Sequence, residues 1–378
     1  MRRADVVMLG GGIIGCALAE ELARWGQRVL VLERGRIGAE ASSAAAGILS
    51  SQMDLPGPGP FFELCQAARR MYRGWVRHLE RAAGRSVGFH QDGILYLAAT
   101  RREAGRMVQR VRWQRARGLP AERWSAAEIR RREPAVDGRF VCGFFFPTEA
   151  QLDNGALMDV LAAACRLAGA VLREHTGVRR VLVSRGRVRG VATDRGQIDA
   201  PVVVNCLGSW ADMGGRFPVR LPVEPARGQI LVFQGPRGLF RRTLISERAY
   251  AVQRRDGRLL VGSTIDRAGF EKALTLGGIH SILSGACRLS SALERCPLVD
   301  AWAGFRPRTP DGLPSMGKTS VEGLYVATGH FRHGILLAPI TARLMGQLIL
   351  RGHSSFDLSA FSPSRFQPVL RSTGRLRG

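Results

Sequence analysis

Lysine is nearly missing from this chain of 378 residues: it occurs only at Lys272 and Lys318, although Lys and Arg together number 56. The basic residues are therefore almost all arginines, and they are spread along the whole chain rather than gathered in one nucleic-acid-binding segment. No helix-turn-helix, zinc-finger or RNA-binding signature is present, so we expect no nucleic-acid partner. The net charge of +25 leaves peripheral contact with an anionic membrane surface open.

Long apolar runs and paired cysteine motifs are also missing. No run reaches the roughly 20 residues that a membrane-spanning helix needs. The apolar run that follows Arg2 and Arg3 is interrupted by three glycines, so we do not interpret it as a signal peptide. The seven cysteines are odd in number and form no C-x-x-C, which excludes a typical disulfide framework and favours reduced thiols in the cytoplasm. The H-x-x-H at 330–333 has no third ligand nearby in sequence, so we expect no metal site.

Glycine, by contrast, is abundant and patterned near the N-terminus. The run ADVVMLG (4–10) predicts a buried parallel strand, followed by a helix over 13–25 and a second strand over 27–33. Gly10, Gly12 and Gly15 have G-x-G-x-x-G spacing, which allows a tight turn, close approach of a pyrophosphate, and contact between helix and strand. Glu33 ends the second strand, where a carboxylate accepts hydrogen bonds from an adenosine ribose. We therefore predict a dinucleotide site, and the acid at position 33 indicates a ligand without a 2′-phosphate.

The rest of the chain predicts two domains of mixed structure. The segment 38–50, GAEASSAAAGILS, is short in side chains and predicts backbone packed against a flat ligand rather than a third strand. A strand at 324–327 followed by Gly329 and a helix from about Gly334 would point a second helix N-terminus at the same ligand. Further helices are predicted over 61–84, 101–118 and 155–169. Hairpin turns are predicted at 184–187, 194–197 and 256–257.

Four stretches resemble the D-amino-acid oxidase superfamily of flavoproteins, and within it the glycine oxidases: GGGIIG (10–15), SAAAGIL (43–49), WAGFRPRTPDGLP (302–314) and GHFRHGILLAP (329–339). The resemblance runs essentially from end to end. It implies an α/β, Rossmann-like doubly wound domain that binds FAD, with a mainly antiparallel-sheet substrate domain over the flavin. The FAD is implied to be non-covalent, since no cysteine lies near 314–316, where sarcosine-oxidase relatives attach it. The implied FAD-binding domain comprises 1–84, 150–218 and 300–378, and the substrate domain 85–149 and 219–299.

The same resemblance implies the residues of the site. The substrate carboxylate would bind Arg306 and Arg332, with Tyr250 as the active-site tyrosine. A carboxylate favours a planar, bidentate cation, and an arginine beside the apolar AWAGF is costly to desolvate without an anion. The implied FAD contacts are Gly10, Gly12, Ile13, Ile14, Gly15, Glu33, Arg34, Ala41, Ser42, Ala46, Gly47, Ile48, Val178, Gly208, Gly329, His330, Phe331, Arg332, His333, Gly334, Ile335 and Leu336.

The implied activity is oxidative deamination of glycine and small amines or D-amino acids. Glycine, O2 and water would give glyoxylate, NH3 and H2O2 through an imine, whose use in thiamine thiazole synthesis is a further expectation. Such chemistry needs position and electrostatics from the protein more than acid–base groups. A quinone-linked D-amino-acid dehydrogenase at a membrane surface and a non-catalytic FAD-binding subunit remain alternatives, and a homo-oligomer stays open. The Pro- and Gly-rich segment 51–60, near where relatives have a mobile lid, leaves substrate size open.

Overall fold

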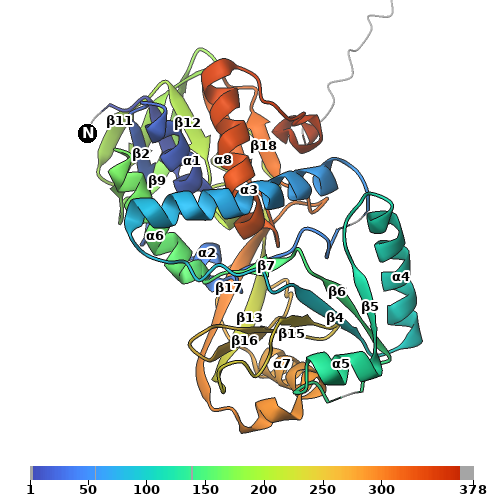
Figure 1. Cartoon of the computed structure of the whole chain (residues 1–378). Helices are drawn as coiled ribbons and strands as arrows, with labels where there is room; N and C mark the ends of the chain where they lie inside the picture. The colour runs from blue at the N-terminus through green and yellow to red at the C-terminus, as the bar shows by residue number, and fades with distance from the viewer. Residues whose placement is uncertain (1–2, 56, 138, 367–378) are drawn as a thin grey trace, which may run out of the picture.

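Two large sheets organise the chain, and they lie in the upper and lower parts of Figure 1. The computed structural model describes residues 3–55, 57–137 and 139–366. The ends of the predicted FAD-binding domain, 1–2 and 367–378, lie outside the described residues. One sheet has six strands in the order β18-β19-β12-β1-β2-β8, and the other has eight in the order β17-β13-β16-β15-β14-β4-β6-β5. We call each sheet, with the elements that cover it, the α/β half and the antiparallel half.

The six-stranded sheet is parallel except at one edge. Only the pairing of β18 with β19 is antiparallel among its described strands. On β1, Val6 and Met8 point into a core shared with helices, whereas Val7 and Leu9 point into a second core on the opposite face. Burial on both faces explains why this strand is an unbroken apolar run. The strands are β1 (Val6–Leu9), β2 (Val29–Leu32), β8 (Val171–Arg173), β12 (Val202–Asn205), β18 (Ser315–Lys318) and β19 (Leu324–Thr328).

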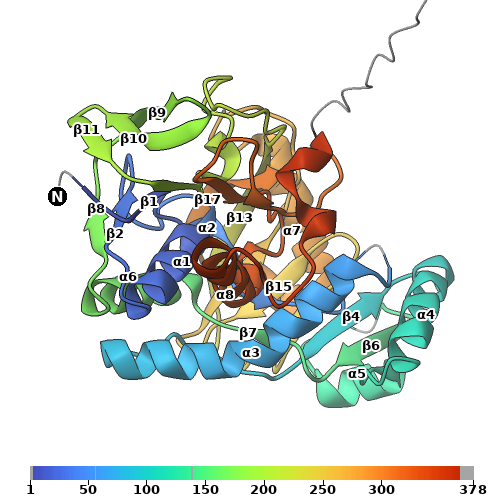
Figure 2. The same ribbon diagram turned by 90° about the horizontal axis from the view of Figure 1, so that it is seen from above.

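Different layers cover the two faces of this sheet, as Figure 2 shows. One face is covered by α1 (Ile13–Arg24), α6 (Asn154–Leu167) and α8 (Gly334–Arg351), and the other by the three-stranded sheet β9 (Val178–Ser184), β10 (Arg187–Thr193) and β11 (Gly196–Asp199). The helix α8 is long and apolar enough to cross a membrane by length and composition only, but 61% of it is buried in the protein. It packs against α1 and against α3 (Pro60–Ala83). The predicted Rossmann-like α/β fold is confirmed.

The eight-stranded sheet is antiparallel apart from the parallel pair β14–β4, which confirms the predicted mainly antiparallel sheet. The helix α7 (Leu276–Leu289) covers one face, where Leu231 and Phe233 of β13 join its core. Ile230 and Val232 alternate with them and pack against Ala46 of the α/β half. The strands are β4 (Ile94–Ala98), β5 (Glu122–Ser125), β6 (Cys142–Phe146), β13 (Glu224–Gln234), β14 (Thr243–Ile245), β15 (Tyr250–Gln253), β16 (Arg258–Gly262) and β17 (Leu298–Arg308).

Several elements connect or flank the two halves. The strand β17 begins before residue 300, the expected domain boundary, and pairs with β13 along its length in the eight-stranded sheet. The domain boundaries themselves stay a prediction. Within 38–50 the chain forms the short helix α2 (Ala41–Ala44) and the two-residue strand β3 (Ile48–Leu49), which pairs with β7 (Ala150–Gln151). The remaining elements are α4 (Arg101–Arg115), α5 (Ala126–Arg132) and short 3₁₀ helices at Gly208–Trp210, Ser291–Arg295, Ser359–Phe361 and Pro363–Phe366.

Candidate active site

A cavity of about 600 Å³ lies between the two halves. At one end it is lined by Gly10 and Glu33, which follow β1 and β2 at the carboxyl edge of the parallel sheet. At the other end it is lined by Tyr250 of β15 and Arg306 of β17. Parallel α/β sheets bind ligands at this edge, and the volume is in the range of small-molecule and cofactor sites.

The glycine-rich turn leaves room for a ligand at one position only. Gly10 has a φ of +100°, and a Cβ there would lie 2.7 Å from the carbonyl oxygen of Cys206. A Cβ on Gly15 would overlap the carbonyl of Gly10. At Gly12, the only described atom within 4 Å of an added Cβ is the Ser42 Oγ, at 3.3 Å. The protein thus requires glycine at positions 10 and 15 for its own packing, whereas the space at Gly12 opens on the cavity and suits a pyrophosphate.

Glu33 is held in place by the turn that it faces. Its Oε2 accepts a hydrogen bond from the backbone N–H of Gly11 at 2.8 Å, and its Oε1 accepts one from Gly35 at 2.8 Å. A carboxylate has about four acceptor positions, so each oxygen keeps capacity for a ribose hydroxyl. The first helical N–H, that of Ile13, donates to the Ser42 Oγ at 2.9 Å. These bonds fix the acid and the start of α1 around the place expected for an adenosine diphosphate group.

An aromatic wall that the sequence analysis missed stands beside this end of the cavity. The Arg34 guanidinium lies 3.9 Å from the ring centroid of Trp210, a cation–π contact. The ring of Phe270 stacks on that of Trp210, with the ring centroids 5.1 Å apart. The only signal in the sequence was the position of Trp210, two residues after Gly208.

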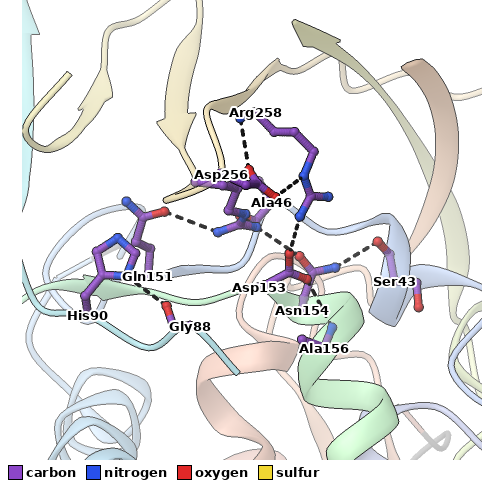
Figure 3. A network of polar contacts seen from close by, with 11 residues as sticks. Ser43, Ala46, Gly88, His90, Gln151, Asp153, Asn154, Ala156, Asp256 and Arg258 are labelled. Carbon is purple, nitrogen blue, oxygen red and sulfur yellow. Dashed lines mark hydrogen bonds and ion pairs between the residues drawn. The ribbon is translucent and has the colours of Figure 1, made fainter. Parts of the chain in front are cut away.

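Buried polar side chains hold the small-residue segment 42–47 against the cavity, and Figure 3 shows this network. The Asn154 amide donates to the carbonyl oxygens of Ser42 and Ser43, both at 2.8 Å. The Arg254 guanidinium, only 5% exposed, donates to the carbonyl of Ala46 at 2.9 Å and to the Asn154 Oδ1 at 3.2 Å. Burial lowers the pKa of Arg254 to about 10, which still leaves it charged at neutral pH. Side chains from both halves therefore fix the backbone that lines the cavity between Ala41 and Ile48.

The two histidines of the H-x-x-H line the cavity and are neutral at pH 7. Burial lowers the pKa of His330 to about 3 and that of His333 to about 4. The His330 Nε2 lies 3.1 Å from the Thr341 Oγ1, and the His333 ring meets Phe61 edge-on at 5.1 Å. Within the part of the chain that the structure describes, no group of three or more His, Cys, Asp or Glu is arranged to hold a metal ion.

Arg306 reaches into the opposite end of the cavity as a cation with a fixed direction. Its Nη2 donates to the Ser263 Oγ at 2.8 Å, and its Nη1 donates to the carbonyl of Thr264 at 3.1 Å. Burial lowers its pKa from the usual value, an effect that the nearby Tyr250 opposes. Burial in turn raises the pKa of the Tyr250 phenol, so the tyrosine is neutral at pH 7.

Three glycines on neighbouring strands leave space at this end of the cavity. A Cβ on Gly228 of β13 would overlap the Arg306 guanidinium. A Cβ on Gly262 of β16 would lie 2.6 Å from the Tyr250 hydroxyl, and one on Gly304 of β17 would lie 2.5 Å from the Cβ of Ala44. The limited space, rather than an unusual backbone, favours glycine at these positions.

Arg332 lines the same cavity, but its nearest anion is part of the protein. Its Nη1 lies 2.9 Å from the Asp54 Oδ1. Asp54 comes from the Pro- and Gly-rich segment 51–60, which the sequence analysis singled out without assigning its acid a role.

The structure brings nearly all of the predicted site residues together. Gly15 and Gly329 support the turns from behind and do not line the cavity, and Val178, at the start of β9, is also absent from the lining. Lining residues that were not predicted include Trp210, Ser263, Asp54 and Arg110. The predicted residues that line it are Gly10, Gly12, Ile13, Ile14, Glu33, Arg34, Ala41, Ser42, Ala46, Gly47, Ile48, Gly208, Tyr250, Arg306, His330, Phe331, Arg332, His333, Gly334, Ile335 and Leu336.

Comparison with known proteins assigns this arrangement to a family. The model of the family described as FAD dependent oxidoreductase matches residues 5–348. The chain belongs to the FAD-dependent oxidoreductase family. It is 34% identical to a glycine oxidase of Geobacillus kaustophilus over 96% of this chain and 97% of that protein, and the crystal structure of glycine oxidase from Geobacillus kaustophilus superposes with a TM-score of 0.93 at 33% identity, covering 96% and 98% of the two chains.

Some proteins to which this chain is similar are much longer. The chain is 37% identical to the bifunctional protein ThiO/ThiG of Trichormus variabilis over 98% of this chain but only 56% of that protein. It therefore spans about half the length of these first curated relatives.

The residues present fit FAD, the cofactor of this family. The open space at Gly12, the free acceptor capacity of Glu33 and the Arg34–Trp210 wall suit the adenosine diphosphate part. The backbone of 44–48 and of 330–336 lines the middle of the cavity, where a flat ring would lie between the two halves. Cys206 also lines the cavity, but burial raises the pKa of its thiol, which keeps it unreactive.

Proposed function

We propose that this protein is a glycine oxidase that converts glycine and small amines or D-amino acids to the imine, which hydrolyses to a carbonyl product (glyoxylate from glycine) and ammonia or an amine. Identity to glycine oxidases over nearly the whole of both chains supports this assignment. The observation that carries it is the half-buried guanidinium of Arg306, fixed in direction by Ser263, which lines the cavity together with the neutral phenol of Tyr250. FAD, when bound, accepts the electrons of the C–H bond and passes them to O2, giving H2O2.

In this proposal the chain supplies position and electrostatics. Arg306 binds the substrate carboxylate through two parallel charge-assisted hydrogen bonds, a geometry that lysine cannot reproduce. Tyr250 adds a neutral donor beside it. The apolar and small residues around the cavity exclude water, which strengthens these interactions and favours the neutral substrate amine.

The decisive experiment is anaerobic reduction of the purified protein. Glycine, sarcosine or small D-amino acids should bleach the flavin, and admission of air should restore it with formation of peroxide. A bleached flavin that persists in air but is restored by a soluble quinone would replace the oxidase by a dehydrogenase. Bleaching by a 2-hydroxy acid and by no amine would refute the substrate class.

The setting of the reaction belongs to the same proposal. All seven cysteines are free thiols, and five of them are buried, which suits a reducing cytoplasm. Delivery of the imine to thiazole synthesis is supported by the bifunctional ThiO/ThiG relatives, in which the region similar to this chain is joined to a further part. An enzyme that supplies the imine should support that synthesis in a mixture with the purified thiazole-forming enzyme and glycine, and no product in that mixture would refute the role.

A further inference from the structure

The ion pair between Asp54 and Arg332 is the feature of the cavity that a single-carboxylate substrate does not explain. It joins the guanidinium of Arg332, whose side chain is 37% exposed, to the carboxylate of Asp54, whose side chain is 53% exposed. Exposed ion pairs contribute little stability, so an incoming anion can displace the Asp54 carboxylate from Arg332. The partner that Arg332 has in the free protein is therefore an anion of the size and charge of a substrate carboxylate.

Space for a larger substrate adjoins this pair. A second cavity of about 360 Å³ is lined by Asp54, Arg332, Arg110 and His333, all of which also line the main cavity. The ion pair therefore lies where the two cavities meet. A substrate bound to Arg306 in the main cavity could place a second carboxylate on Arg332 only if that carboxylate replaced the one of Asp54.

The charges around Asp54 favour a second anion. Arg110 is partly buried, and its Nη2 donates only to a backbone carbonyl, that of Leu55, at 3.2 Å among the contacts that the structure describes. Asp54 is near both Arg110 and Arg332, and its negative charge also raises the pKa of Arg306 against the lowering by burial. His333 is neutral and adds no charge. Among the carboxylates that the structure describes on the second cavity, Asp311 is paired with Arg365 at 2.8 Å, and Asp54 is the one paired with Arg332.

We propose that Asp54 is a specificity-determining residue: by occupying Arg332 it restricts the site to amino acids with one anionic group, and its removal admits amines that have a second carboxylate. This inference rests on the proposed function for its turnover test, but its binding test is independent of turnover. The substrate class concerned is N-carboxymethyl amines, of which iminodiacetate is the simplest.

The binding test uses two ligands that contain no amine. Methoxyacetate has one carboxylate, and oxydiacetate has the same ether with a carboxylate at each end. Their dissociation constants are measured by perturbation of the flavin absorbance of the holoenzyme. We expect Asp54→Asn to improve the ratio of oxydiacetate to methoxyacetate affinity by about 10-fold, since a second charge-assisted bond becomes available. The added substitution Arg332→Gln should remove this gain.

The variants are chosen so that the backbone is retained. Asp54 has a φ of +50°, a conformation that Asn and Gly adopt more readily than other residues, so Asp54→Asn and Asp54→Gly both suit the turn. Glu247→Gln is the matched control, because Glu247 forms a similar exposed pair, 2.8 Å from Arg106, on the same cavity. This control should leave the affinity ratio unchanged.

The turnover test compares sarcosine with iminodiacetate, which differ by one carboxylate. The ratio of kcat/KM for iminodiacetate to that for sarcosine should rise about 10-fold in both Asp54 variants and should stay constant in Glu247→Gln. Equal changes for both substrates, or a gain that survives Arg332→Gln, would overturn the role of Asp54. If sarcosine and glycine do not reduce the wild-type flavin, the proposed function fails, and the affinity ratio alone then decides the inference.

Discussion

Replacing Gly228 by alanine should damage substrate binding without damaging the fold. The added methyl group would overlap the guanidinium of Arg306, whereas the backbone φ at Gly228 is one that alanine adopts. The tip of an arginine side chain moves more cheaply than a strand, so the guanidinium shifts and loses its bond to the Ser263 Oγ. The cost therefore falls on the orientation of the carboxylate anchor.

The magnitude follows from the bonds at stake. Misalignment of the fork removes at least one charge-assisted hydrogen bond to the substrate, about 1.5–3 kcal/mol. We expect kcat/KM for glycine to fall by about 10- to 100-fold, since each 1.4 kcal/mol is a factor of ten. Arg306→Ala should lose about 10²-fold or more, and Arg306→Lys should retain the charge but lose the fork.

The assay is steady-state oxidation of glycine and of a primary amine without a carboxylate, together with FAD content and Tm. Gly235→Ala is the matched control, because its methyl would lie 2.5 Å from the Leu259 side chain, just beyond the same strand and away from Arg306. The reasoning is refuted if Gly228→Ala leaves the KM for glycine unchanged. It is also refuted if the amine without a carboxylate loses as much activity as glycine.

The remaining predictions concern the cofactor and Glu149, a fully buried carboxyl group that accepts hydrogen bonds from Ser51. Gly12→Val should give folded but colourless protein, because the branched side chain would fill the pyrophosphate space. Acid precipitation of the wild-type protein should release FAD into the supernatant. Colour that stays in the pellet would indicate covalent attachment. Burial raises the pKa of Glu149 to about 7, so its protonated form stabilises the fold below its unfolded value of 4.5, and this stability is lost as the pH rises through about 7. Between about pH 5 and pH 8 the Tm of the wild type should therefore fall relative to that of Glu149→Gln, and parallel Tm profiles would contradict this.

Sequence reasoning succeeded where the signal was local. The strand, the three glycines, the helix and Glu33 lie within the first 33 residues, and each has a pattern that follows from backbone geometry. Hydrophobic periodicity located most of the helices because their periods are repeated over several turns.

The residues that the sequence did not reveal are joined only by the fold. Arg254 and Asn154 are 100 positions apart, and Asp54 is far from Arg332 in sequence, so no periodicity connects them. Gly228, Gly262 and Gly304 resemble ordinary strand glycines until their neighbours on adjacent strands are known. Val178 was placed by resemblance alone, and its contact with FAD remains a prediction.

The packing of α1 against α8 determines when the α/β half can form during synthesis. The strand β1 and the helix α1 leave the ribosome before β12, β19 and α8, yet β1 pairs with β12, β12 pairs with β19, and α1 packs on α8. Until residues 324–351 have emerged, the nascent chain exposes apolar surface that later becomes core, and such surfaces promote aggregation. Truncation before α8 would therefore remove more than one helix, because it would leave β1 and α1 without the packing partner that completes their core.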